Sequence, residues 1–124
     1  MIKVRTDIKK YIEKNIPELK GRVTPLFVMD LSAPSVAYAV TDVLGGHLRQ
    51  SQLEIKIIGT DYEKCDSLST QMADILDFKI DEPFVIEGTT RFWCTLSGGG
   101  ILFQDEIQAF EFTQYYTIKW REIK

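Results

Sequence analysis

The segment from Ala109 to Arg121 constrains the fold most strongly, because apolar and polar side chains alternate along it. The apolar side holds Phe110, Phe112, Tyr116, Ile118 and Trp120, and the opposite side holds Glu111, Thr113, Tyr115, Thr117, Lys119 and Arg121. A period of two residues predicts a β-strand with one buried face. Strands usually run for about 5–6 residues, so this longer segment is expected at the centre of a sheet or projecting towards a partner.

Two helices are predicted from apolar residues that recur every three or four positions. The first runs from Ile8 to Ile16, with Thr6 or Asp7 as its N-cap, and Pro17 ends it. The second runs from its N-cap, Asp61, to Leu76. Its apolar stripe is Cys65, Leu68, Met72, Ile75 and Leu76.

The rest of the chain is predicted to be strands joined by short connections. The candidate strands are Val23–Asp30, Ser35–Thr41, Leu48–Ile58, Pro83–Glu87, Thr89–Leu96 and Ile101–Glu106. Gly45-Gly46 favours a hairpin with a long, mobile connection, and Gly98-Gly99-Gly100 is expected to break a strand as a tight or mobile connection. The order α-β-β-β-α-β-β-β predicts a single α+β domain over residues 1–124. We expect a mainly antiparallel sheet with both helices on one face.

Composition fits an ordinary globular protein, with 44% hydrophobic and 27% charged residues. No apolar run approaches the ~20 residues of a membrane span, and no apolar stretch follows the first basic residues, so neither membrane insertion nor a signal peptide is expected. The net charge of −3 disfavours nucleic-acid binding, which needs clustered cations.

The charge is unevenly distributed along the chain. Residues 1–24 carry a net charge of +4, and residues 61–87 carry −6. One interpretation is two solvated helix faces of opposite sign. The other is that copies of the chain meet, basic segment against acidic segment. The contact residues expected in that case are Lys9, Lys10 and Lys14 on one side and Asp66, Asp74 and Asp77 on the other.

Catalytic and metal-binding motifs are not evident. Cys65 and Cys94 are isolated and expected to be buried thiols, the lone His47 lies in a predicted loop, and no lysine completes a phosphate loop at the glycine run. A divalent-cation site at Asp61, Glu63 and Asp66 is a weaker alternative to a solvated acidic face. The sequence therefore predicts no catalytic residue, no metal and no cofactor.

Aromatic residues on the polar side of two predicted strands suggest a protein interface. Trp93 and Tyr115 lie on the faces opposite the apolar side chains. Aromatic side chains are enriched at interfaces. A stacking platform for single-stranded nucleic acid is the alternative, disfavoured because few cations lie nearby.

Over nearly its whole length the chain resembles the tail-completion or tail-terminator proteins of long-tailed bacteriophages, also known as minor tail, minor capsid or head–tail joining proteins. The resemblance lies in the order of elements and in three segments: Pro34-Ser-Val-Ala-Tyr38, Leu53-Glu-Ile-Lys-Ile57 and Tyr116-Thr-Ile-Lys-Trp120. It implies a non-enzymatic α+β subunit that forms rings, typically hexamers, at the head-proximal end of the tail tube. Its partners would be its own copies, the tube protein and the head connector. It would reside in the virion, and in the bacterial cytoplasm during assembly.

The resemblance also implies an assembly loop between the middle strands, at residues 42–51, that orders on assembly. Its candidate residues are Asp42, Leu44, Gly45, Gly46, His47 and Arg49. The competing classes are another protein-interaction domain, a nucleic-acid-binding module and a small α+β ligand-binding or enzymatic domain. The last would need polar residues converging in an apolar interior.

Overall fold

Six strands form one sheet in the order β1-β2-β3-β6-β5-β4 in the computed structural model, which describes residues 2–25, 33–44 and 49–123. Along the chain the elements are α1 (Ile2–Asn15), the short 3₁₀ helix η1 (Pro17–Leu19), β1 (Val23–Pro25), β2 (Ser35–Leu44), β3 (Arg49–Gly59), α2 (Tyr62–Leu76), β4 (Val85–Glu87), β5 (Thr90–Gln104) and β6 (Ala109–Glu122). The predicted α+β class and the order of elements are confirmed.

The long strand β6 lies at the centre of the sheet, as its length predicted. It pairs antiparallel with β3, from Trp120 opposite Arg49 to Phe110 opposite Gly59. On its other side it pairs antiparallel with β5 along almost its whole length. Only β1 and β2 pair in parallel among the described strands.

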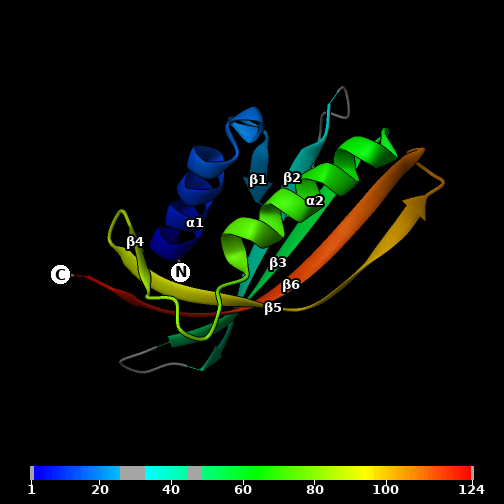
Figure 1. Cartoon of the computed structure of the whole chain (residues 1–124). Coiled ribbons are helices and arrows are strands. Elements are labelled where there is room, and N and C mark those ends of the chain that lie inside the picture. Colours follow the sequence, from blue (N-terminus) through cyan, green and yellow to red (C-terminus); the bar gives the residue numbers. More distant parts are fainter. Residues whose placement is uncertain (1, 26–32, 45–48, 124) are drawn as a thin grey trace.

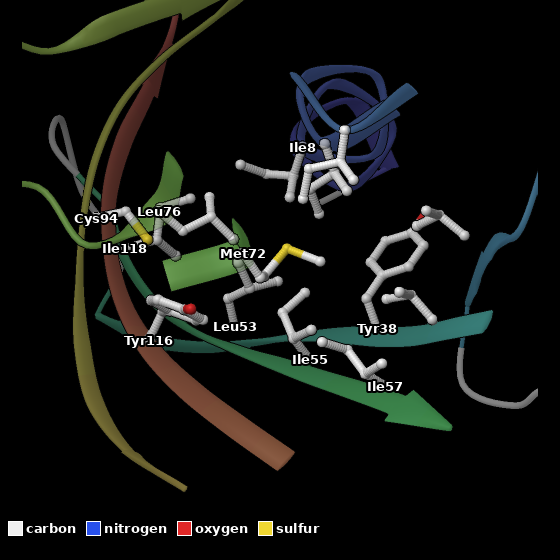
Figure 2. Close-up of a cluster of buried hydrophobic side chains, with 14 of the residues drawn as sticks. Ile8, Tyr38, Leu53, Ile55, Ile57, Met72, Leu76, Cys94, Tyr116 and Ile118 are labelled. Carbon is white, nitrogen blue, oxygen red and sulfur yellow. The ribbon is translucent and has the colours of Figure 1, made fainter. Parts of the chain in front are cut away.

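Both helices cover the same face of the curled sheet (Figure 1). Tyr11 joins them, because its hydroxyl donates to the Ile75 carbonyl oxygen at 3.0 Å and its ring meets Phe92 edge-on at 5.1 Å. The core lies between helices and sheet (Figure 2), with fully buried side chains that include Ile8, Ile12, Leu53, Ile55, Ile57, Met72, Leu76, Cys94, Tyr116 and Ile118. The predicted apolar faces of α1, α2, β3 and β6 therefore meet in one core.

The predicted start of the first helix is wrong, whereas that of the second is confirmed. The helix α1 begins at Ile2, so Thr6 and Asp7 lie inside it. The stripe extends to the buried Val4, one turn earlier than expected. The Asp61 carboxylate caps α2 by accepting from the Glu63 and Lys64 amides at 3.1 and 3.3 Å.

The glycine run does not break the strand, contrary to the prediction. Strand β5 continues through Gly98, Gly99 and Gly100, with a β-bulge between Leu96 and Gly98 that absorbs the irregularity. The Ser97 hydroxyl supports the bulge by donating to the Tyr115 carbonyl oxygen at 3.0 Å. The two predicted strands on either side of the glycines are therefore one.

Two other predicted segments differ in extent. Of Val23–Asp30, only Val23–Pro25 is seen as a strand, and the remainder lies outside the described residues. The loop predicted at 42–51 is too long, because β2 runs to Leu44 and β3 starts at Arg49, with Asp42 paired to Ser51. The antiparallel pairing expected across Gly45-Gly46 is confirmed, while the two glycines lie outside the described residues.

Candidate assembly surfaces

The two cysteines are buried, as predicted. Cys65 and Cys94 are both free thiols inside the core. Burial raises the pKa of each thiol, and Asp61 adds to the effect at Cys65 and Asp77 at Cys94. Since the thiolate is the reactive form, neither cysteine is suited to nucleophilic chemistry.

Neither a metal-binding cluster nor a membrane-spanning helix is found in the described part of the chain. No group of three or more His, Cys, Asp and Glu side chains gathers there as a metal site would require. Neither helix combines the length and apolar character needed to cross a bilayer.

One groove lies beside η1 and the start of β2, with a volume of about 210 Å³. Its lining is Glu18, Leu19, Arg22, Ala33, Pro34, Lys64 and Leu68. The Arg22 guanidinium in its wall donates to the Pro34 and Ala33 carbonyl oxygens at 3.0 and 2.8 Å. The groove is smaller than the ~300–1,000 Å³ of ordinary ligand pockets, so it offers little support for a ligand-binding function.

The basic residues of α1 are partly occupied by contacts within the chain. Lys14 forms an ion pair with Glu87 at 3.5 Å. Lys10 is exposed and Lys9 half-buried. Lys14 still exposes 70% of its side chain, so the interface role of Lys9, Lys10 and Lys14 stays a prediction.

The acidic residues of α2 divide in the same way. Asp66 and Asp74 are exposed on the helix surface. Asp77, at the end of α2, accepts from the Thr95 hydroxyl at 3.1 Å and the Leu96 amide at 2.9 Å. Asp77 therefore ties α2 to β5, and the interface role of Asp66, Asp74 and Asp77 stays a prediction.

Trp93 and Tyr115 lie half-buried on the sheet face away from the helices, as predicted. The Trp93 ring meets Phe78 edge-on at 6.4 Å and has the Lys119 ammonium 5.9 Å from its centre. Tyr115 is opposite Glu54 on one side and Gly98 on the other. Trp93 is therefore partly covered by its own chain, and the interface role of both residues stays a prediction.

The ends of β2 and β3 near the predicted assembly loop are held by a buried polar contact. The Ser51 hydroxyl donates to the Asp42 carboxylate at 3.0 Å and accepts from the Trp120 indole N–H at 3.0 Å. The Arg49 guanidinium lies 5.4 Å from the Trp120 ring centre. Asp42, Leu44 and Arg49 belong to strands, whereas Gly45, Gly46 and His47 lie outside the described residues.

Several exposed apolar side chains along β4 and β5 were not predicted. The most exposed of them on β5 are Ile101 and Leu102, at 55% and 54%. The sequence signal was three consecutive apolar residues, Ile101 to Phe103, directly after the glycine run. This signal was not recognised because the strand was expected to end at the glycines. These residues were then assigned to a separate strand.

Comparison with known proteins gives a match at the level of structure. No family model and no curated protein matches the chain. A chain of the solved structure described as "Virion of native gene transfer agent (GTA) particle" is similar with a TM-score of 0.65 at 12% sequence identity, covering 94% of this chain and 96% of that one. At this identity, the likeness shows that the two chains share a fold over nearly their full lengths.

Proposed function

We propose that the chain is a structural protein of a phage-like particle that completes or terminates the tail tube and joins it to the head connector. The observation that carries the proposal is the fold shared, over nearly the full length of both chains, with a component of a gene transfer agent virion. The order of elements that resembles tail-completion proteins is the second support. The protein acts by assembly and not by catalysis.

The distribution of charge suggests how copies of the subunit meet in a ring. Lys9 and Lys10 belong to α1, and Asp66 and Asp74 to α2, while both helices cover one face of the sheet (Figure 1). A closed ring is built from head-to-tail contacts between neighbouring copies. In such a contact the basic surface of one copy would meet the acidic surface of the next. Complementary charge also speeds the encounter between copies.

Deletion of the gene in the bacterium that carries it tests the function. We expect heads without tails and tails of uncontrolled length in electron micrographs, and normal particles when the chain is supplied in trans. Mass spectrometry of purified particles should find the protein in them, at the head-proximal end when labelled with antibody. Normal particles from the deletion strain would refute the proposal.

Charge reversal tests the ring contact separately. Asp66→Lys with Asp74→Lys is expected to abolish complementation at low salt, because both surfaces are then positive. Adding Lys9→Asp and Lys10→Asp to the same chain restores the complementarity and should restore complementation. Failure of the reversal to affect particle yield would rule out this contact but leave the proposed function intact.

A further inference from the structure

One edge of the sheet is open over half of its last long strand. Strand β4 covers only the start of β5, from Thr90 to Phe92, and Asp77 binds the Leu96 amide a little further along. From residue 97 to 104, β5 pairs with β6 and with no other described strand. The open part of β5 and the turn after it form an arm, residues 97–108, at the opposite end of β5 from β4 (Figure 1).

The strand of the arm is apolar on both of its faces. Ile101 and Phe103 lie opposite Phe112 and Phe110 of β6, on the face that the helices cover. Leu102 belongs to the other face, because neighbouring side chains of a strand alternate. Ile101, Leu102 and Phe103 are 55%, 54% and 43% exposed. Natural proteins usually protect an open edge with charge or proline, and the strand part of the arm contains neither.

On the helix side, the exposed apolar residues of the arm continue onto α2. Tyr62, the first residue of α2, meets the rings of Phe110 and Phe112 at 5.2 and 5.1 Å, and Phe103 meets Phe110 at 5.0 Å. Phe112 is buried, whereas Tyr62 is 40% exposed and Phe110 half-buried. We call Tyr62, Ile101, Phe103 and Phe110 the apolar patch. A contiguous exposed patch of this kind marks an interaction surface.

Acidic residues border the apolar patch on two sides. The arm ends in Asp105 and Glu106, both exposed. On α2, Asp66 follows Tyr62 by four residues, a spacing that places two side chains on the same side of a helix. Asp66 is also exposed. The surface therefore combines apolar side chains with negative charge.

No basic residue of the described chain offsets these acids at the patch. Lys64, the one basic residue of α2, lies on the other flank of the helix, where it lines the groove beside η1. Lys56 lies on the opposite face of the sheet, in ion pairs with Glu54 and Glu111. The sequence has no lysine, arginine or histidine from residue 92 to 118. A partner of this surface would therefore have to supply the positive charge.

Glycines in the arm leave room for a neighbouring backbone. A Cβ on Gly98 or Gly100 would meet no atom within 4 Å, and neither residue has a positive φ. Nothing in the described subunit therefore requires glycine there. Glycine inside a strand often marks the close approach of another backbone.

We propose that the arm binds an extended segment of another protein, which adds as a strand to the open edge of β5 and carries basic and apolar side chains. An extended segment fits because an open edge offers unpaired main-chain groups for a new ladder. Its side chains alternate between the two faces, so one set covers the apolar patch and the other covers Leu102. Its basic residues lie near Asp66, Asp105 and Glu106.

A second copy of the chain is a poorer occupant of this edge. Two arms set edge to edge would bring the acids of one towards those of the other, with no basic residue between Arg91 and Lys119 to offset them. The basic helix α1 keeps its apolar stripe, from Val4 to Ile16, in its own core. The inference goes beyond the proposed function, because it follows from the edge, the patch and the charges alone.

Fluorescence anisotropy with a dye-labelled peptide tests the proposal on the purified full chain. The probe has about ten residues, the length of a long strand, and lysine alternates with valine along it. We expect saturable binding that weakens as salt screens the exposed charges. The matched probe, with glutamate in place of every lysine, should not bind. Absence of binding by the lysine probe would overturn the proposal.

A serine substitution in the chain locates the site. Ile101→Ser should weaken binding of the lysine probe by about tenfold, because a buried apolar contact is lost. The matched control is Ile86→Ser on β4, where the side chain is 59% exposed, and it should leave binding unchanged. Unchanged far-UV circular dichroism would show that both variants fold. Equal binding by Ile101→Ser and the wild-type chain would contradict the proposed site.

Charge reversal tests which acids attract the segment. Asp105→Lys with Glu106→Lys should lose the lysine probe and bind the glutamate probe instead. The control, Asp81→Lys with Glu82→Lys, makes the same change of charge in the exposed turn before β4 and should keep the lysine probe. Loss of the lysine probe in the control alone would overturn the proposal. Asp66 stays unchanged in every variant, because the proposed ring contact also uses it.

N-methylation of the probe tests whether it adds as a strand. In an added strand the amides of alternate residues face β5, so they belong either all to valine or all to lysine. Methylating one of these two sets should abolish binding, and methylating the other should leave it intact. Binding by both methylated probes, or by neither, would refute the strand pairing.

These outcomes are separate from those for the proposed function, since the probe can fail to bind while the deletion strain still lacks finished tails. Analytical ultracentrifugation covers the remaining alternative. We expect no self-association that depends on the arm. A wild-type dimer that Ile101→Ser converts to monomer would show that a second copy covers the edge, and would overturn the proposal.

Discussion

Replacing Asp7 by alanine tests how α1 is fixed to the sheet. The Asp7 side chain is 5% exposed. Its Oδ2 accepts from the Thr90 hydroxyl at 2.7 Å and from the Thr89 amide at 3.2 Å. Gly88 lies so close that any Cβ there would collide with the carboxylate. The chain therefore brings a residue near its start onto the turn between β4 and β5.

The size of the effect follows from these contacts. A hydrogen bond to a charged group contributes about 1.5–3 kcal/mol, and a buried donor left without an acceptor costs about 1–3 kcal/mol. Thr90 is 1% exposed, so its hydroxyl would lose its acceptor without gaining water. The higher helix propensity of alanine returns about 0.5 kcal/mol. We expect Asp7→Ala to lower the free energy of unfolding by about 2–3 kcal/mol.

Urea denaturation of Asp7→Ala, Thr90→Val and the double variant measures this coupling. The pair should show an interaction energy of about 1–2 kcal/mol, because the second change removes the donor that the first leaves unsatisfied. If Asp7 were instead an exposed N-cap, its removal would cost about 1 kcal/mol and would not couple to Thr90. Coupling near zero would therefore refute the buried contact. Asn15→Ala, at the exposed end of the same helix, controls for general effects on α1.

Three further predictions concern the glycine run, a buried thiol and the polar contact at Trp120. Gly99→Ala should destabilise the fold by about 1–3 kcal/mol, because a Cβ there would collide with the Thr113 carbonyl oxygen. Gly100→Ala, measured in the same urea titration, should be neutral or slightly stabilising, because a Cβ there would meet no atom within 4 Å. Burial raises the pKa of the Cys94 thiol above its ordinary value of 9.0, so the unfolded thiol ionises first. Below pH 9 this thiol should not change the free energy of unfolding, and above pH 9 it should lower it by about 1.4 kcal/mol per pH unit. In thermal melts at pH 9–11, Cys94→Ala should therefore lose stability less steeply with pH than the wild-type chain. Ser51→Ala should cost about 1–3 kcal/mol, seen in tryptophan fluorescence during urea unfolding, because the buried Trp120 N–H loses its acceptor; an unchanged midpoint would contradict this.

The elements that could be predicted from the sequence are those with a regular apolar period. Leu53, Ile55 and Ile57 alternate on β3, and Cys65, Leu68, Met72 and Leu76 form a stripe on α2, and all seven are buried as expected. When apolar residues recur at the period of a helix or strand, the type of element and its buried face can be predicted from that segment alone. For this reason the class, the order of elements and the central place of β6 were all predictable.

The role of Asp7 could not be predicted, because it depends on residues 82 and 83 positions away. An aspartate just before an apolar run is typical of an N-cap, and only the tertiary fold shows that Val4 continues the stripe and buries the carboxylate. The same limit applies to Asp77, whose place on an acidic helix suggested a solvated face. In the structure its carboxylate binds Thr95 and the Leu96 amide.

The glycine run shows how a correct local rule, that glycine weakens a strand, led to a wrong prediction. One long strand was divided into two, and the exposed apolar residues after the glycines were not recognised. Three glycines weaken a strand through entropy, but β6 provides a paired neighbour along its whole length, and the ladder keeps β5 intact. Within the described subunit, Gly99 is required by the close approach of Thr113, whereas nothing there requires Gly98 and Gly100. A strand that keeps two such glycines beside an uncharged, apolar edge is less stable alone than it could be. The continuous ladder with β6 outweighs that cost within the subunit, and a rule that considers the glycines locally cannot include it.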